Sequence, residues 1–288
     1  MPTSPLARLA HTRPGSRVVV RHLIEDGERA TDVLGELVSL DAEAVTVTRK
    51  GEEIRIPLRD VVVAKEVSAA PVGRGWRVAS FMRRAAVGVF DLDGVLRGFN
   101  ASGWQGAHEE AFGLRPGGLP ELAFSLPEGS DMVIGRSTHA AWMRALETHL
   151  TGQGHAPERV AAAVSEWKAD HGTPIEPTVT LVDELRGRGT PVFVFTNGTD
   201  RVPEELASIG LERLVPHLLN SHDLGFAKPA PEAYAVAHAE IERRLARRVG
   251  TAEVHFTDDR PGNVDAARVF GWQARVFTPP PGTPRLNG

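Results

Sequence analysis

The 288-residue chain contains no cysteine. This absence excludes disulfide bonds, thiolate nucleophiles and cysteine-ligated zinc sites. The chain also lacks an apolar run that approaches the ~18 residues of a membrane span, and its first 15 residues hold no apolar signal-peptide core. We therefore expect a cytoplasmic protein that does not act at a membrane. The formal net charge of −4 gives no support to a general role in binding nucleic acid.

Short strand patterns fill the N-terminal part of the chain, residues 1–67. Apolar residues form alternating patterns or short runs, and turn residues such as those in Glu25-Asp26-Gly27 separate them. The predicted strands cover residues 17–23, 32–40, 44–50, 53–58 and 60–67. Five short strands, with Gly35 inside the long second one, predict a small all-β barrel of SH3-like or Sm-like size.

This barrel resembles the one that precedes GNAT acetyltransferases in some actinobacterial proteins, across GERATDVLGELVSLDAEAVTV and RIPLRDVVVAKEV, although no acetyltransferase pattern follows it here. Residues 16–67 hold eight Lys or Arg against eleven Asp or Glu, and no Phe, Tyr or Trp. Because nucleic-acid platforms present a basic stripe and stacking aromatics, we expect a structural or dimerising module. Residues 68–85 are predicted to form a linker with a short helix near residues 80–84.

From Ala86 onward, apolar strand patterns alternate with amphipathic helical patterns. The strand patterns cover residues 87–90, 191–195, 254–257 and 274–277, and two of the helical patterns cover residues 158–172 and 179–189. Continuous β-branched or aromatic runs are typical of parallel strands buried on both faces. The alternation predicts an open, Rossmann-like parallel α/β sheet. Such sheets bind ligands beyond the carboxyl ends of their strands.

Polar residues follow these predicted strands. They are Asp91 and Asp93, Thr196-Asn197-Gly198, and Asp258-Asp259, with Lys228 before a helix expected to begin near Ala230 or Pro231. Carboxylates that converge on one sheet edge repel one another unless a cation lies among them. Without cysteine or a neighbouring histidine, Mg²⁺ is the expected cation. A lysine, a hydroxyl group and backbone N–H groups suit a phosphoryl group, so the pattern predicts a phosphoryl-transfer site.

The ordered segments DLDGV, FTNG, AKPAPEAY and FTDDRPGNVDAA resemble the four motifs of the haloacid dehalogenase-like (HAD) superfamily. The resemblance covers about residues 86–280. It implies a catalytic core formed by residues 86–98 and 176–288. The long helical interval after the first motif resembles the helical cap of this superfamily, which implies a cap over residues 99–175.

The resemblance also implies roles for the acidic residues. Asp91 would be the nucleophile that is phosphorylated. Asp93 would protonate the leaving oxygen and then deprotonate the attacking water. Mg²⁺ would be bound by Asp91, the Asp93 carbonyl and Asp259. Asp258 would orient Lys228 or a metal-bound water.

The remaining motif residues would hold the phosphoryl group. Thr196 and the backbone beside Asn197 would bind its oxygens, and Lys228 would neutralise charge on Asp91 and the transferred group. Many members carry another acid where this chain has Asn263. The substitution implies either weaker Mg²⁺ binding or a residue that only orients a water.

Residue 93 separates the reaction classes of the superfamily. Members that displace halide need no proton donor and typically lack an acid two residues after the nucleophile. Asp93 therefore favours hydrolysis of a phosphate ester, with a small phosphorylated metabolite as the expected substrate. A phosphomutase uses the same pair of aspartates and is one alternative. A binding or regulatory protein that acts through the barrel is another.

Substrate choice is expected to lie in the cap. Arg97, Phe99 and Asn100 follow the nucleophile loop and are candidates for contact with the leaving group, and the Gly/Pro-rich residues 114–135 are a second candidate region. Three tryptophans fit packing between cap helices because they lie among apolar residues at helical spacing, namely Trp104, Trp142 and Trp167. A homodimer through the barrel or the cap is a further expectation.

Overall fold

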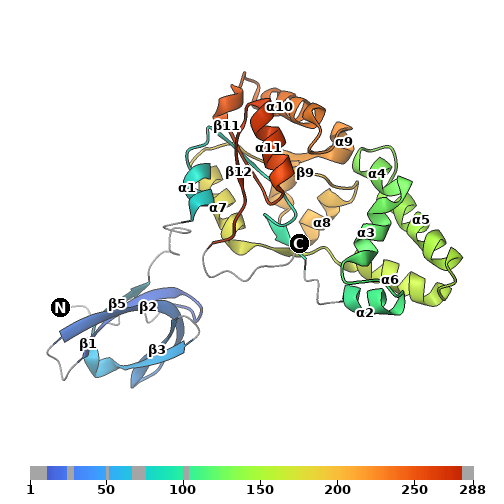
Figure 1. Cartoon of the computed structure of the whole chain (residues 1–288). Helices are drawn as coiled ribbons and strands as arrows, with labels where there is room; N and C mark the ends of the chain where they lie inside the picture. The colour runs from blue at the N-terminus through green and yellow to red at the C-terminus, as the bar shows by residue number, and fades with distance from the viewer. Residues whose placement is uncertain (1–11, 25–28, 50–51, 67–75, 100–103, 281–288) are drawn as a thin grey trace. The chain divides into compact units, whose positions relative to one another are not determined.

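The computed structural model describes residues 12–24, 29–49, 52–66, 76–99 and 104–280 (Figure 1). The chain divides into two compact units, residues 1–74 and residues 75–288. Each unit has a hydrophobic core of its own. Within the described residues, no helix has both the length and the apolar character that crossing a membrane requires.

The first unit is a five-stranded antiparallel sheet, in agreement with the predicted small β domain. Its elements are β1 (Arg17–Ile24), β2 (Arg29–Leu40), β3 (Ala44–Arg49), β4 (Glu52–Pro57), the 3-10 helix η2 (Leu58–Asp60) and β5 (Val61–Glu66). The strand order is β4-β3-β2-β1-β5. Val18 and Val45 lie in the aliphatic core of this sheet. Gly35 lies where β2 approaches β3 closely, because a Cβ there would clash with the backbone oxygen of Thr48.

The second unit is built on a five-stranded parallel sheet. Its strands are β6 (Val87–Phe90), β9 (Val192–Thr196), β10 (Leu218–Asn220), β11 (Val254–Asp258) and β12 (Gln273–Val276), in the order β10-β9-β6-β11-β12. β6 pairs with both β9 and β11, so it lies at the centre of the sheet. The Asp91 N–H extends this pairing by donating to the Thr257 carbonyl at 2.9 Å. The predicted open α/β sheet is confirmed.

Helices cover both faces of this sheet. They are α1 (Arg77–Met82), α7 (Glu176–Gly187), α8 (Val202–Ser208), α9 (Ser221–Leu224), α10 (Pro231–Leu245) and α11 (Pro261–Phe270), with the 3-10 helices η3 (Glu212–His217) and η4 (Thr251–Glu253). Val87 and Val89 pack in one cluster with side chains of α10 and α11. Gly88, which faces the other way, lies against Met82 of α1. Burial on both faces explains why these strands are continuously apolar.

The structure differs from the predicted linker in the second half of residues 68–85. Trp76 is 1 % exposed, and its indole N–H donates to the Thr278 carbonyl. α1 buries Phe81 and Met82 against the sheet unit. The physical reason is hydrophobic burial: these side chains are too large and apolar to be left in a solvated linker.

The described part of the cap contains five helices, and Figure 1 shows these helices grouped beside the sheet. They are α2 (Trp104–Ala111), α3 (Gly118–Ser125), α4 (Pro127–Val133), α5 (His139–Gly152) and α6 (Pro157–Ala169). Trp142 is buried in their common core, with Trp104 and Trp167 packed against it, as the helical spacing predicts. The chain enters and leaves the cap through a short antiparallel pair, β7 (Arg97–Gly98) and β8 (Thr173–Pro174).

Candidate active site

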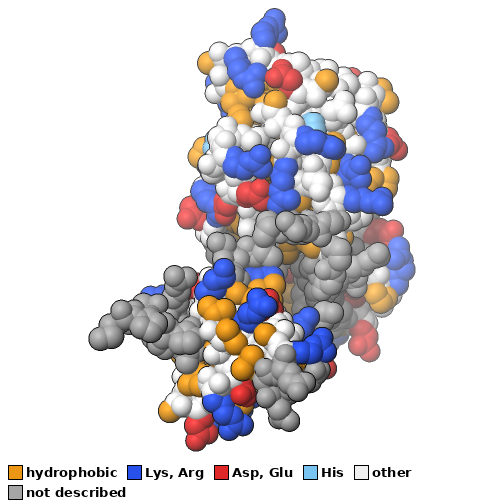
Figure 2. Space-filling view, turned by 90° about the vertical axis from the view of Figure 1, so that its left-hand side faces the viewer, with side chains coloured by type: hydrophobic (Ala, Val, Ile, Leu, Met, Phe, Trp, Pro, Cys, Tyr) orange, Lys and Arg blue, Asp and Glu red, His pale blue; other side chains and the backbone are white. Residues whose placement is uncertain are grey.

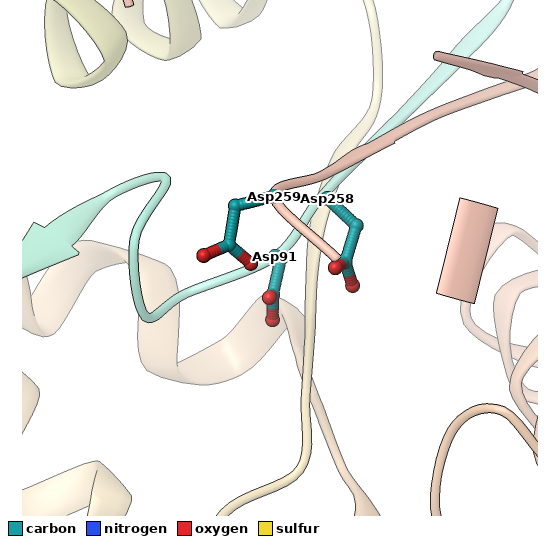
Figure 3. Close-up of side chains that lie close together, drawn as sticks. All are labelled: Asp91, Asp258 and Asp259. Carbon is teal, nitrogen blue, oxygen red and sulfur yellow. The ribbon is translucent and has the colours of Figure 1, made fainter. Parts of the chain in front are cut away.

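The acidic residues meet beyond the ends of the central strands. Asp91 follows β6, Asp258 ends β11 and Asp259 follows it. Figure 3 shows the three carboxylates close together. One oxygen of each lies within 4.8 Å of the others. Adjacent parallel strands that end at one edge bring together residues that are far apart in the sequence.

Asp259 has the geometry of a cation ligand. Its Oδ1 is buried and has no hydrogen-bond partner among the described residues, which is costly for a carboxylate. Gly94 makes room for it: this residue has φ +78°, and a Cβ there would clash with the Asp259 carboxylate. Burial raises the pKa of Asp259, and the Asp258 charge raises it further. Clustered carboxylate oxygens are the ligands that Mg²⁺ takes, so the residues present fit this ion.

Lys228 is the buried cation of the site. Its Nζ donates to Asp91 Oδ1 at 2.8 Å, to Asp258 Oδ2 at 2.6 Å and to the Phe195 carbonyl at 2.8 Å. Burial alone would lower the pKa of Lys228, but the two carboxylates outweigh it and raise the pKa above its ordinary value. The ammonium group therefore stays charged and uses all three of its hydrogens.

Asp91 lies in an environment that opposes its own charge. Burial raises its pKa to about 7, and Asp258 contributes in the same direction, while Lys228 lowers the pKa. The Leu92 N–H donates to Asp91 Oδ1 at 2.8 Å. A bound cation would favour the charged carboxylate that a nucleophile must present.

Asp258 is buried and fully hydrogen-bonded on the protein side. The Asn263 amide donates to its two oxygens at 3.1 and 2.9 Å, and the Arg260 N–H donates to Oδ1 at 2.8 Å. These donors, with Lys228, hold the Asp258 carboxylate in place. The Asn263 amide thus supports Asp258, where an acid would repel that carboxylate. Weaker Mg²⁺ binding and the orienting of a water by Asn263 both remain predictions.

Asp93 is held by an arginine from the cap entrance. Arg97 Nε donates to Asp93 Oδ1 at 2.7 Å, and Arg97 Nη1 donates to Glu205 Oε2 at 2.8 Å. The Arg97 side chain is 4 % exposed, whereas the Asp93 side chain is 45 % exposed. The Asp93 carboxylate is therefore accessible to solvent, whereas the arginine that holds it is buried.

The other predicted site residues occupy different surroundings. Thr196 is buried at the end of β9. The Asn197 amide brackets the Lys228 backbone, donating to its carbonyl at 2.7 Å and accepting from its N–H at 2.8 Å. The Phe99 ring lies 4.9 Å from the Arg97 guanidinium carbon. Asn100 lies outside the described residues.

Two positioning groups near the site have weak sequence signals. Glu205 lies on α8 and reaches Arg97 only through tertiary structure. Ser221 follows β10, and its hydroxyl accepts from the Gly198 N–H at 3.1 Å and donates to the Val133 carbonyl of the cap at 2.7 Å. The three-residue strand β10 is too short for a periodic pattern to reveal it. A polar residue after a short apolar run was the available signal for Ser221.

The cap is bonded to the core beside the site. The His139 N–H at the start of α5 donates to Asp200 Oδ1 at 2.8 Å. His222 Nδ1 lies 2.9 Å from the Met132 carbonyl, and the Arg201 guanidinium donates to the Lys168 carbonyl at 3.2 Å. These contacts attach the cap to the core segments that follow β9 and β10.

Parts of the chain are similar to known proteins. Residues 12–65 match the Rv0428c N-terminal Sm-like domain. The (S)-2-haloacid dehalogenase 2 of Pseudomonas sp. is 26 % identical over 101 residues, which cover 35 % of this chain and 42 % of that protein. An uncharacterised hydrolase of Schizosaccharomyces pombe is 26 % identical over 145 residues, which cover 49 % of this chain and 62 % of that protein. The chain thus spans less than two thirds of either relative.

Solved structures of similar fold include enzymes of two kinds. A HAD family enzyme of Bacteroides thetaiotaomicron, in complex with magnesium and inorganic phosphate, aligns at 18 % identity and a TM-score of 0.48, over 67 % of this chain and 93 % of that one. The L-2-haloacid dehalogenase of Xanthobacter autotrophicus aligns at 21 % identity and a TM-score of 0.48, over 66 % and 76 %. Residues 87–271 match the haloacid dehalogenase-like hydrolase family over most of the second unit. The chain belongs to the haloacid dehalogenase-like hydrolase family.

Proposed function

We propose that the protein is a Mg²⁺-dependent phosphatase that hydrolyses a small phosphorylated metabolite. The observation that carries the proposal is the pairing of two differently placed carboxylates on one loop. Asp91 is buried against Lys228 and lies next to Asp259, whose Oδ1 has no hydrogen-bond partner in the part of the chain that the structure describes. Asp93, two residues later, is half-exposed and held by Arg97. One carboxylate suits attack at phosphorus and the other suits proton transfer.

The reaction needs two displacements at phosphorus. An Asp91 oxygen attacks the phosphorus, the ester P–O bond breaks, and its electron pair stays on the leaving oxygen, which takes a proton from Asp93. A water then attacks the aspartyl-phosphate and gives a proton to Asp93. The P–O bond to Asp91 breaks, releasing inorganic phosphate and restoring the Asp91 carboxylate.

The charges at the site match this chemistry. Asp91 and Asp259, with the Asp93 carbonyl, would hold Mg²⁺, which supplies neutralisation of the phosphoryl oxygens when bound. Lys228, which is paired with Asp91, would neutralise charge on that carboxylate and on the transferred group. Asp258, with Asn263, keeps Lys228 in place.

Dehalogenation is the alternative that the relatives raise. Halide leaves as a stable anion and takes no proton, so a held acid at position 93 would have no task in that reaction. A phosphomutase would use the same aspartates and differ in how the cap excludes water. The contacts between cap and core favour a small substrate in either case.

A phosphate-release screen over a panel of phosphorylated metabolites tests the proposal. Asp91→Asn, or EDTA added to the wild type, is expected to lower the rate at least about 1000-fold, as loss of a nucleophile does elsewhere. Asp183→Asn is the matched control, because this aspartate pairs with Arg213 on the surface, outside the site. Chloride release from 2-chloropropionate without phosphate release, or full activity of Asp91→Asn, would overturn the proposal.

A further inference from the structure

The Arg97 guanidinium is contacted by protein groups on several sides. It lies between two carboxylates, at 2.7 Å from Asp93 and 2.8 Å from Glu205. Its Nη1 also lies 3.4 Å from the His171 carbonyl, where the chain leaves the cap. The Phe99 ring covers it at 4.9 Å. A side chain so enclosed is poorly placed to contact a substrate, which was the role expected for it.

The backbone around Arg97 is equally constrained. The Gly94 N–H donates to the Arg97 carbonyl at 2.8 Å, and the Arg97 N–H donates to the Leu92 carbonyl at 2.9 Å, so the loop that carries Asp93 closes on Arg97. Gly172 packs on the side chain, since a Cβ there would lie 2.8 Å from Arg97 Cγ. Both the entrance and the exit strand of the cap therefore fix this arginine.

Asp93 needs such support because its own side chain is half-exposed. A solvated carboxylate samples several rotamers, and proton transfer requires one direction. Glu205 holds the guanidinium from the far side, so that Nε is presented to one oxygen of Asp93. The planar fork of arginine can bind two carboxylates at fixed angles, which lysine cannot do.

We infer that Arg97, held by Glu205, is a positioning residue that orients Asp93 for proton transfer and ties this orientation to the seated cap. The inference rests on the proposed phosphatase function. It predicts that Arg97 and Glu205 act in the proton-transfer step. The side-chain hydrogen bonds that hold Asp93 join Arg97 to Asp93 and to Glu205, and they do not involve Asp91, Lys228 or Asp259. Replacing either residue should lower the hydrolysis rate only for substrates whose leaving group needs a proton.

Two esters of similar shape provide the test. The leaving oxygen of para-nitrobenzyl phosphate must be protonated, whereas para-nitrophenolate leaves without a proton. For Arg97→Met we expect first-turnover rates about 100-fold lower on the benzyl ester, the scale of general acid catalysis, and within about threefold of wild type on the phenyl ester. Arg97→Lys should restore little of the loss. Glu205→Gln, which keeps the shape of the side chain, should lower the benzyl rate about fivefold and spare the phenyl rate.

Arg83→Met is the matched control, because Arg83 makes a bidentate ion pair with Glu184 at 2.9 and 2.7 Å away from the site. It should change neither rate by more than about twofold. If Arg97→Met and Glu205→Gln lower the rates on both esters equally, this inference is overturned and the proposed function still stands. A rise in KM without a fall in kcat would have the same meaning. A wild-type protein inactive on both esters would overturn the proposed function and this inference with it. If Arg97→Met does not fold, Glu205→Gln decides.

Discussion

Both units of the molecule carry Lys, Arg, Asp and Glu side chains at the surface, as Figure 2 shows for one face, but they differ in whether they also bury charged pairs. In the described part of the barrel, the ion pairs lie at the surface, as with Arg21 and Asp32, whose side chains are 54 % and 56 % exposed. In the second unit, Lys228 is paired with Asp91 and Asp258 in the interior. Buried charge costs several kcal/mol per ion unless it is paired. Buried clusters of this kind are typical of functional sites, so the contrast supports placing the proposed activity in the second unit.

The largest effect is expected from removing the buried cation. Lys228→Met leaves Asp91 and Asp258 facing each other without a counter-charge, and this should lower the free energy of unfolding by about 3–5 kcal/mol. Urea unfolding in EDTA measures it. Arg213→Met, which removes a half-exposed partner of Asp183, is the control and should cost less than about 1 kcal/mol. A similar cost for both variants would remove the contrast between buried and surface charge.

Gly94→Ala should act on both stability and metal binding. The left-handed φ of +78° makes a Cβ unfavourable, and the added atom clashes with the Asp259 carboxylate. We expect Mg²⁺ affinity to fall about tenfold or more, the scale of a disturbed ligand, in calorimetric titrations. Gly210→Ala is the control because Gly210 has φ +76° but open space around its Cβ. Gly210→Ala should lower stability and leave Mg²⁺ affinity unchanged. If Gly210→Ala also lowered Mg²⁺ affinity, backbone strain alone would explain the effect of Gly94→Ala.

Without metal, the stability of the second unit should fall as the pH rises from about 4 to 7. The pKa of Asp91 is raised from 3.8 to about 7 in the folded protein. The folded state therefore binds more protons than the unfolded state in this window, and stability decreases with pH by about 1–3 kcal/mol. Thermal melts in EDTA measure the slope. Asp91→Asn should flatten it and be more stable than wild type at pH 8, whereas Asp183→Asn should keep it. A wild-type stability that rises through this window would contradict the expectation.

The smallest effect is expected from the barrel. Arg21→Met removes a half-exposed partner of Asp32 at 3.9 Å, and the unfolding free energy should change by less than about 0.5 kcal/mol because solvent screens the pair. Removal of residues 1–74 should leave kcat/KM on phosphate esters within about twofold, since every site residue described above lies beyond residue 90. A larger loss of activity would assign the barrel a part in catalysis.

Four of the five strands of the parallel sheet, all except β10, and most of the chemistry-bearing residues of the second unit could be predicted from the sequence. The run VGVF is β6 without any change of boundary, because a strand buried on both faces is apolar at every position. Asp91, Asp258 and Asp259 could be expected at one edge because parallel strands share the edge at which they end. The catalytic roles assigned to them remain predictions.

Other features depend on contacts that no local pattern encodes. α1 was expected within a linker, yet Trp76 and Phe81 are buried against the sheet unit. Glu205 is separated from Arg97 by the whole cap, and no periodicity links the two residues. Asn263 could be seen as a departure from the family pattern, but its use as a donor to Asp258 required coordinates.

The sequence by itself determined the fold class, the family and the set of acids that follow the central strands. Strand periodicity, strand ends and motif order can be identified without a structure, because they depend on the order of residues along the chain. The tertiary structure alone decided how those acids differ. Burial opposite Lys228 separates Asp91 from Asp93, and Arg97 faces Asp93 because Glu205 holds it from another helix. The burial of a side chain and the charges around it depend on residues that are distant in the chain. Coordinates were therefore needed to distinguish these acids.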